Sequence, residues 1–219
     1  RLGQLDIPPV RRHQALGGAD PGEAVHVHHQ ERDVAEHVAD PEIVIEGEAI
    51  EDARGRGDEP TELRAEMERA RLAYLRGPTE PDGVRALARR AIAVFGAMAS
   101  DADLADAWQL MGIAELAARD RGAQLEALQR GRVHALASGD TRREIESWNE
   151  VGGAMLFGRS PVGETLAFLD EELTWARARG LAAVEADALL GGPYLYSRLG
   201  RFDEARDQLE RSKAICREL

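Results

Sequence analysis

The sequence predicts an all-α fold in which about four helical hairpins stack into an α-solenoid. Apolar residues recur at helical spacing through the last two thirds of the chain, and glycine or proline breaks follow at intervals of about 17 to 22 residues. The third observation is internal repetition, because Gly112, Gly152 and Gly192 are 40 residues apart, as are Trp108 and Trp148. Repeated hairpins jointly bury an apolar face that one hairpin cannot bury alone.

Composition divides the chain at residue 60. Residues 1–60 contain no aromatic residue, three leucines, 14 acidic and 6 basic residues, and most of the histidines. Such a stretch buries little apolar area against its ordering entropy, so we expect a poorly ordered, acidic N-terminal segment. Residues 61–219 are the predicted repeat domain, with Thr61 as the expected N-cap of its first helix.

The later helices are placed by their breaks and their apolar stripes. The second helix is predicted from about Asp82 to Ala99, with Met98 facing inward. Further breaks are expected at Gly122, Gly139-Asp140, Ser160-Pro161, Gly180 and Gly200. Cys216 is the only cysteine, which excludes a disulfide within the chain, and it falls on the expected buried stripe of the last helix. We therefore predict that Cys216 is a small core residue.

The repeat has a packing explanation. The first helix of each hairpin contributes a large residue, namely Trp108, Trp148 or Leu189, and a glycine follows three or four residues later. A glycine has no side chain to hold two backbones apart, so it allows the second helix to approach closely. Ala135, Trp175 and Ile215 repeat at the same interval in the second helices. We expect the tryptophans to be core residues and not a stacking platform for nucleic acid.

The C-terminal unit resembles a tetratricopeptide repeat in the run Leu189, Gly192, Tyr196, Gly200, Phe202, Ala205, Leu209 and Ser212. Pro193 departs from that pattern, and the period of 40 exceeds the usual value of about 34. Residues 82–219, which include Arg90–Phe95, Ala107-Trp108, Gly139–Glu144 and Ser160–Val162, are similar to the C-terminal helical region of large bacterial signalling ATPases. Those relatives carry a nucleotide-cyclase domain or a helix-turn-helix output. The resemblance implies a cytoplasmic protein-interaction or sensory module without catalysis of its own.

A solenoid of hairpins presents a concave face lined by the first helix of each pair, and such faces bind peptides or helices. By position relative to Trp108 and Trp148, the sequence predicts a peptide-binding groove formed by Asp106, Gln109, Glu146, Asn149, Asp187, Tyr194 and Arg198. The expected partner is a protein or peptide, and no cofactor is expected.

Several function classes are not supported by the sequence. The net charge of -12 lacks the electrostatic attraction that nucleic-acid binding requires, and no apolar run is long enough for a membrane span. Phosphate-loop, nucleophile-elbow, zinc-helix and dinucleotide motifs are all missing. Paired acids such as Glu171-Glu172, or Glu144 with Glu146, stand beside arginines and are predicted to form solvated ion-pair faces.

Two alternatives remain. The cluster His26, His28, His29 and His37 contains imidazoles of the kind that bind zinc, which would suit a metal-dependent hydrolase. The chain begins with Arg1 and is alternatively a fragment without an independent function, which would self-associate through the uncapped ends of its repeats.

Overall fold

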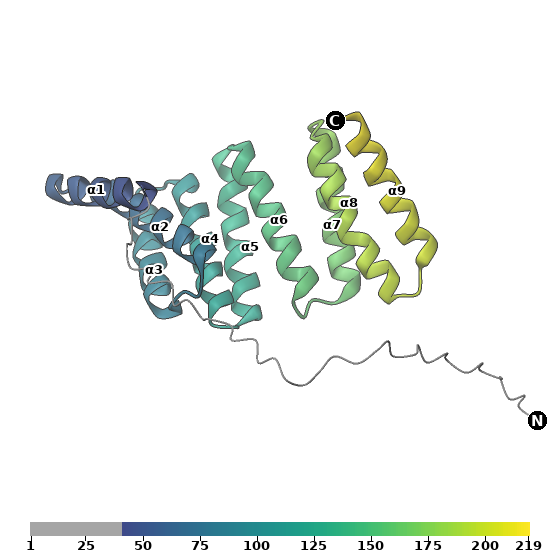
Figure 1. The fold of residues 1–219 in the computed structure, drawn as a ribbon, viewed down its shortest axis with the longest axis horizontal. Helices are drawn as coiled ribbons and strands as arrows, with labels where there is room; N and C mark the ends of the chain where they lie inside the picture. Colours follow the sequence, from purple (N-terminus) through teal and green to yellow (C-terminus); the bar gives the residue numbers. More distant parts are fainter. Residues whose placement is uncertain (1–40) are drawn as a thin grey trace, which may run out of the picture. The chain divides into compact units, whose positions relative to one another are not determined.

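The computed structural model describes residues 41–219, apart from the side chains of residues 41–46 and 49. This part of the chain contains nine helices and no strand: α1 (Pro41–Arg56), α2 (Glu59–Arg76), α3 (Pro81–Ala97), α4 (Asp101–Ala117), α5 (Arg121–Ser138), α6 (Thr141–Phe157), α7 (Val162–Ala178), α8 (Ala182–Arg198) and α9 (Phe202–Glu218). Short turns reverse the chain between them, and successive helices pack beside each other in chain order (Figure 1). The all-α prediction is confirmed for these residues.

The helical region begins earlier than the composition suggests. Helix α1 covers Pro41–Arg56, within the stretch that was expected to be poorly ordered. Ile50 and Ala53 are almost completely buried, and Arg54 forms an ion pair with Glu62 of α2 at 2.7 Å. A few aliphatic side chains are enough here because α1 buries one face against a neighbouring helix and does not need a core of its own. Residues 1–40 lie outside the described residues.

Two helix starts differ from the sequence prediction. The N-cap of α2 is Asp58 and not Thr61, because a carboxylate oxygen of Asp58 accepts a hydrogen bond from the backbone N–H of Thr61 at 3.2 Å. Pro60 fits the first turn, since its missing N–H would have no partner there. Gly122 was expected to be a break but lies in the first turn of α5, which Asp120 caps through the N–H of Ala123.

The turns at Gly180 and Gly200 do occur where the breaks were predicted. Both glycines have φ near +70°, at 67° and 73° respectively. Side chains rarely adopt this left-handed conformation, so glycine is the residue that lets each helix end and the chain reverse without strain. The hairpins α7–α8 and α8–α9 depend on these two positions.

The repeated glycines lie where paired helices approach each other. A Cβ built at Gly112 would lie 2.7 Å from Leu128 Cδ2, and one at Gly192 would overlap the side-chain amide of Gln208. At Gly152 the corresponding neighbour is Phe168, at 3.5 Å. In each case the contacted residue is 16 positions further along, so the same glycine-to-partner contact recurs with the 40-residue interval. Their predicted packing role is confirmed most strongly at Gly112 and Gly192.

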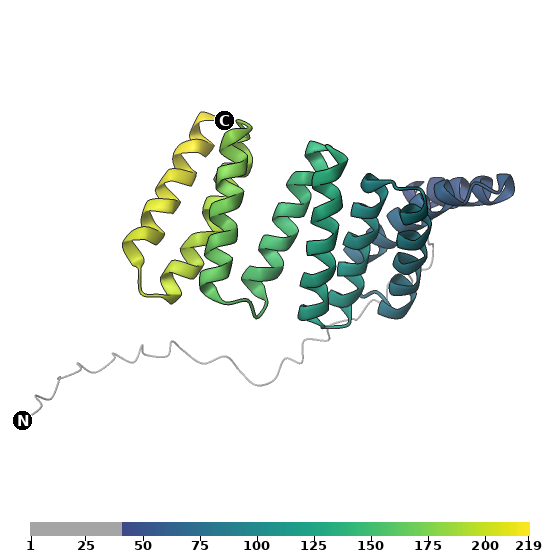
Figure 2. The same ribbon diagram turned by 180° about the vertical axis from the view of Figure 1, so that it is seen from behind.

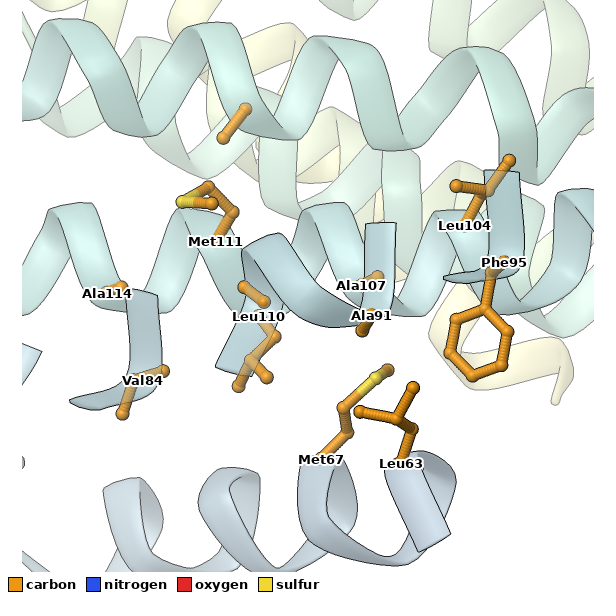
Figure 3. Close-up of a cluster of buried hydrophobic side chains, with 12 residues drawn as sticks. Leu63, Met67, Val84, Ala91, Phe95, Leu104, Ala107, Leu110, Met111 and Ala114 are labelled. Carbon is orange, nitrogen blue, oxygen red and sulfur yellow. The ribbon is translucent and has the colours of Figure 1, made fainter. Parts of the chain in front are cut away.

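The largest core cluster joins α2, α3 and α4 (Figure 3). Leu63 and Met67 of α2 point toward Ala91 and Phe95 of α3, while Leu110 adds a fully buried side chain from α4. Burial of side chains of this size contributes about 1.5–3 kcal/mol each. A smaller cluster lies between α5 and α6, and another, around Leu173 and Leu189, joins α7 and α8.

The predicted burial pattern fails at two helix ends. Met98 is about half exposed, because it is the C-cap of α3 and lies beyond the packed face. Cys216 is exposed and is not a core residue. Within α9 the buried positions are Ala205 and Ser212, so the stripe that contacts α8 excludes the cysteine.

Alternate helices also meet. Helix α2 contacts α4 and α6 contacts α8, in addition to the contacts between successive helices. The view from behind shows the same order of helices (Figure 2). None of the described helices combines the length and the apolar character that crossing a membrane requires.

Candidate functional site

A cavity of about 390 Å³ opens between α2, α4, α5 and α6. Its walls are mainly apolar and include Tyr74 of α2, Ile113 of α4 and Phe157 of α6. Phe157 is 71% exposed, which is unusual for a side chain of this size. Three charged residues also line the first cavity, namely Arg71, Arg121 and Glu150. The first cavity therefore combines an apolar wall with both positively and negatively charged groups.

A second cavity of about 260 Å³ lies among α6, α7 and α8. Leu156, Leu169 and Ala188 contribute apolar surface, and Glu172 and Asp187 contribute two carboxylates. No arginine or lysine of residues 41–219 is among its lining residues. The second cavity is therefore apolar and acidic, in contrast with the first.

The two cavities are related by the sequence repeat. On α4 the first is lined by Gln109, Gly112, Ile113 and Leu116, and on α6 the second is lined by residues 40 positions later, Asn149, Gly152, Gly153 and Leu156. The cavities also share three lining residues, Asn149, Gly153 and Phe157, and therefore adjoin along α6. We call the two together the paired groove. Gly153, which lines both cavities, has no atom within 4 Å of its Cβ position and leaves the space open where they adjoin.

The structure brings three of the seven predicted groove residues to the paired groove. Gln109 lines the first cavity, Asn149 lines both, and Asp187 lines the second. Tyr194 and Arg198 line neither cavity; Tyr194 is half exposed, and the Arg198 guanidinium lies 5.8 Å from its ring centre. One α-helical turn separates these two residues, which places the guanidinium over the ring.

Asp106 and Glu146 are held in ion pairs. Asp106 pairs with Arg143 at 2.8 Å, and Glu146 pairs with Arg142 at 2.7 Å. Both acids line a small cavity of about 20 Å³ between α4, α5 and α6, which has room for little more than one water molecule. Arg143 also binds Asp140 at 2.5 Å, and these contacts keep the pKa of Arg143 above its ordinary value. The Arg143–Asp106 pair joins α6 to α4, whereas the Arg142–Glu146 pair lies within α6.

Glu150 connects the small cavity with the first cavity of the paired groove. Burial raises the pKa of its carboxyl to about 7, although the side-chain amide of Gln109 donates a hydrogen bond to it and Arg71 favours its charged form. A carboxyl with this pKa changes its charge near neutral pH.

Glu172 is the most unusual group in the paired groove. Its side chain was predicted to belong to a solvated ion-pair face, but the residue is only 3% exposed. The side chain of Glu172 forms no hydrogen bond or ion pair within the described part of the chain. Burial and the nearby Asp187 raise its pKa to about 7, while Arg132 acts weakly in the opposite direction. The prediction was wrong because the pattern of residues on α7 does not show that α6 and α8 pack around Glu172.

Glu144 was also predicted to lie on a solvated ion-pair face, and that prediction is wrong for another reason. This residue is buried and accepts a hydrogen bond from the indole N–H of Trp175 at 3.2 Å, and it pairs with Arg179 at 3.1 Å. Its carboxylate therefore joins α6 to α7 and is not part of a solvated surface. Glu172 differs from Glu144 in having no such partners.

The aromatic residues beneath the paired groove form part of the core. Trp148 is 3% exposed, with Phe168 and Trp175 at centroid distances of 4.9 and 5.8 Å. The Arg132 guanidinium stacks on Trp148, 3.7 Å from the ring centre, and its Nε is buried without a hydrogen-bond partner. Burial lowers the pKa of Arg132. The core role predicted for the tryptophans is confirmed at Trp148, while Trp108 and Trp175 are only partly buried.

Sequence reasoning missed the main apolar residues of the first cavity. Tyr74 was not among the predicted groove residues, but it contributes to the cavity wall and is partly exposed. Phe157 gave a signal that was not used: it is an aromatic residue at the last position of α6, immediately before Gly158.

The described residues contain no cluster of three or more histidine, cysteine or acidic side chains placed to hold a metal ion. The histidine cluster that suggested a hydrolase, His26, His28, His29 and His37, lies outside the described residues.

Comparison with known proteins gives no matching family model and no matching curated protein.

Proposed function

We propose that residues 41–219 form a tetratricopeptide-like helical repeat that binds a segment of a partner protein in the paired groove. The observation that carries the proposal is the recurrence of the cavity: residues 40 apart line two adjoining openings, at the same position of two successive hairpins. Repeat proteins bind extended partners along such faces, because each repeat contributes one subsite. The partner is a polypeptide with apolar side chains for the first cavity.

The surface chemistry supports a binding role. The exposed aromatic residue Phe157 lines both cavities. Tyr74 and Leu75 of α2 line the first cavity with it. Leu75 is 77% exposed. Large apolar side chains grouped around a cavity are typical of binding surfaces, whereas single exposed apolar residues are ordinary.

We further propose that this binding serves a scaffold or sensory role in a cytoplasmic bacterial signalling protein, in line with the resemblance of residues 82–219 to the helical regions of signalling ATPases. The chain itself then carries out no catalysis. Its effect on the parent pathway comes from bringing the partner segment to neighbouring domains.

The test uses one glycine as a blocking position. Gly153 lines both cavities, and a Cβ there would meet no atom within 4 Å, so Gly153→Leu fills the groove without disturbing the core. Gly96→Leu is the matched control, since Gly96 is also helical and equally open but lines neither cavity. Peptides are selected from a randomised phage-displayed library on the full chain, and their affinities for the three proteins are measured by calorimetry.

We expect selected peptides that bind wild type and Gly96→Leu alike and lose at least about tenfold in affinity for Gly153→Leu. Failure of the selection to enrich any peptide, or equal binding to all three proteins, contradicts the proposal. A second copy of the chain in the groove is a different outcome, and light scattering would show it as a dimer that Gly153→Leu converts to a monomer.

A further inference from the structure

The second cavity contains a buried carboxylate for which the chain supplies no partner. Glu172 is 3% exposed, lines the cavity, and has a carboxylate oxygen 3.7 Å from the Cβ position of Gly152, which lines it too. Other buried acids of this chain are paired: Asp103 binds Arg64 at 2.7 Å, and Glu144 binds Arg179. The Glu172 carboxylate oxygens, unlike Arg132 Nε, are not sealed from solvent, so the carboxylate is open to the cavity. A carboxylate largely removed from water and without a paired cation favours binding of a positively charged group.

Asp187 places a second acid at the same cavity. It lies on α8, is exposed, and also lines the cavity. The two carboxylates therefore line one cavity from α7 and α8, and the Asp187 charge raises the pKa of Glu172. Two acids that share one site repel each other unless a proton or a cation lies between them.

The nearby arginine does not neutralise them. Arg132 affects the pKa of Glu172, but its guanidinium stacks on Trp148 and forms no ion pair with Glu172. Arg132 and Glu172 occupy equivalent positions of the 40-residue repeat, and the third equivalent, Ser212, is satisfied by the carbonyl of Ala186 at 2.8 Å. Of the three, only Glu172 lines the second cavity.

We propose that the second cavity binds a lysine or arginine side chain of the partner segment, with its cationic head between Glu172 and Asp187. This inference rests on the proposed function. The aliphatic stem lies against Leu156, Leu169 and Ala188, as the stems of long basic side chains commonly lie on apolar surface. Gly152 lies beside the Glu172 carboxylate and Gly191 packs against Leu169, so neither position places a side chain between the stem and the acids.

The two cavities then bind different kinds of side chain from one partner segment. The first accepts apolar side chains beside Arg71 and Arg121, and these arginines disfavour a second basic residue there. The second accepts the basic residue. The partner segment therefore carries apolar residues on one side of a lysine or arginine, and the paired groove fixes its direction.

The experiment extends the peptide selection to two further variants of the full chain. Glu172→Gln removes the buried charge without changing the size of the side chain. Glu171→Gln removes the same charge from the neighbouring exposed position, outside the cavity. We expect peptides selected on wild type and on Glu171→Gln to share a basic residue at one position, and peptides selected on Glu172→Gln to lack that preference.

A double-mutant cycle then measures the coupling between the basic side chain of the peptide and the carboxylate of Glu172. The best wild-type peptide is remade with norleucine in place of its lysine or arginine. We expect norleucine and Glu172→Gln each to weaken binding by about tenfold, and the two together to weaken it no further. Circular dichroism verifies the fold of each variant. Asp187→Asn, at an exposed position, provides a second probe of the same site if Glu172→Gln alters the helical content.

The failures are distinguishable. Peptides that need the groove, shown by loss of binding to Gly153→Leu, but carry no shared basic residue overturn this inference and leave the proposed function standing. The same holds if norleucine and Glu172→Gln act additively. Peptides whose binding is unaffected by Gly153→Leu, or no enriched peptides at all, overturn both.

Discussion

The two halves of the described chain use one repeat with different interiors. In the first half, twelve buried residues from α2 to α5 form a continuous core, and α4 packs extensively along α5. In the second half the clusters contain four and three buried residues, and α6 makes far less contact with α7. The second cavity lies where that contact is weak. The first half therefore contains the larger continuous core, and the second half leaves an acidic cavity between α6, α7 and α8.

The largest expected effect tests this division with matched truncations. Leu110 belongs to the first core and Leu189 to the last, and both are fully buried. We expect Leu110→Ala to lower the free energy of unfolding by about 4–5 kcal/mol and Leu189→Ala by about 2–3 kcal/mol. The loss is smaller for Leu189→Ala because fewer buried side chains surround the space that the truncated leucine leaves. Urea denaturation measures both. Equal losses would mean that the two halves are packed alike.

The next effect concerns the buried acid. Glu172→Gln removes a carboxylate whose pKa is raised from 4.5 to about 7 by burial and by Asp187. The folded state holds its proton more tightly than the unfolded state, so the wild type loses stability as pH rises from about 4.5 to about 7. We expect Glu172→Gln to be more stable than wild type by up to about 3 kcal/mol at pH 8, and equally stable at pH 4.

Thermal unfolding at a series of pH values gives the comparison. Glu150, which also has a raised pKa, is present in both proteins and cancels in the difference. Arg132 and Asp187 are the charged groups that act on Glu172, and both remain unchanged in the variant. A stability difference that stays constant from pH 4 to pH 8 contradicts the buried, unpaired carboxylate.

A smaller effect separates the two kinds of glycine. Leucine at Gly112 collides with Leu128 and forces α4 and α5 apart, so Gly112→Leu is expected to destabilise by about 1–3 kcal/mol. At Gly153 the same change meets open space and replaces a poor helix former, so it stabilises by up to about 1 kcal/mol. Opposite signs in urea denaturation support the assignment of Gly112 to packing and Gly153 to the groove. Destabilisation by both would remove Gly153 as a groove position.

The smallest effect is local to one helix end. The carboxylate of Asp140 accepts hydrogen bonds from the backbone N–H groups of Arg142 and Arg143 at 2.9 and 3.3 Å. These bonds lower its pKa, so its contribution is present at neutral pH and disappears as acid protonates it. We expect Asp140→Ala to cost about 1 kcal/mol at pH 7. An unchanged melting temperature at pH 7 would show that the cap is not needed.

Much of this fold was predictable because its signals are local. Turn glycines such as Gly180 and Gly200, and the equal spacing of Gly112, Gly152 and Gly192, depend on backbone geometry that the sequence expresses directly. Helix α1 was missed because its stability comes from contact with α2 and not from its own composition.

The site was less predictable for the same reason. Gln109, Asn149 and Asp187 were found from the register of the repeat, which places them on the first helix of each hairpin. Glu172 was missed, since its burial depends on how closely α8 approaches α7, and a sequence pattern on one helix does not contain that distance. Asp106 and Glu146 do lie on the expected helices, α4 and α6, but each carboxylate forms an ion pair with an arginine of α6.

The most direct test of the account follows glycine amide signals of the full chain by NMR while the best selected peptide is added. Gly112, Gly153 and Gly191 line the paired groove, whereas Gly55, Gly96 and Gly139 lie away from it. We expect the first three signals to shift together on one binding curve and the second three to stay in place. Shifts confined to Gly55, Gly96 or Gly139 would contradict it.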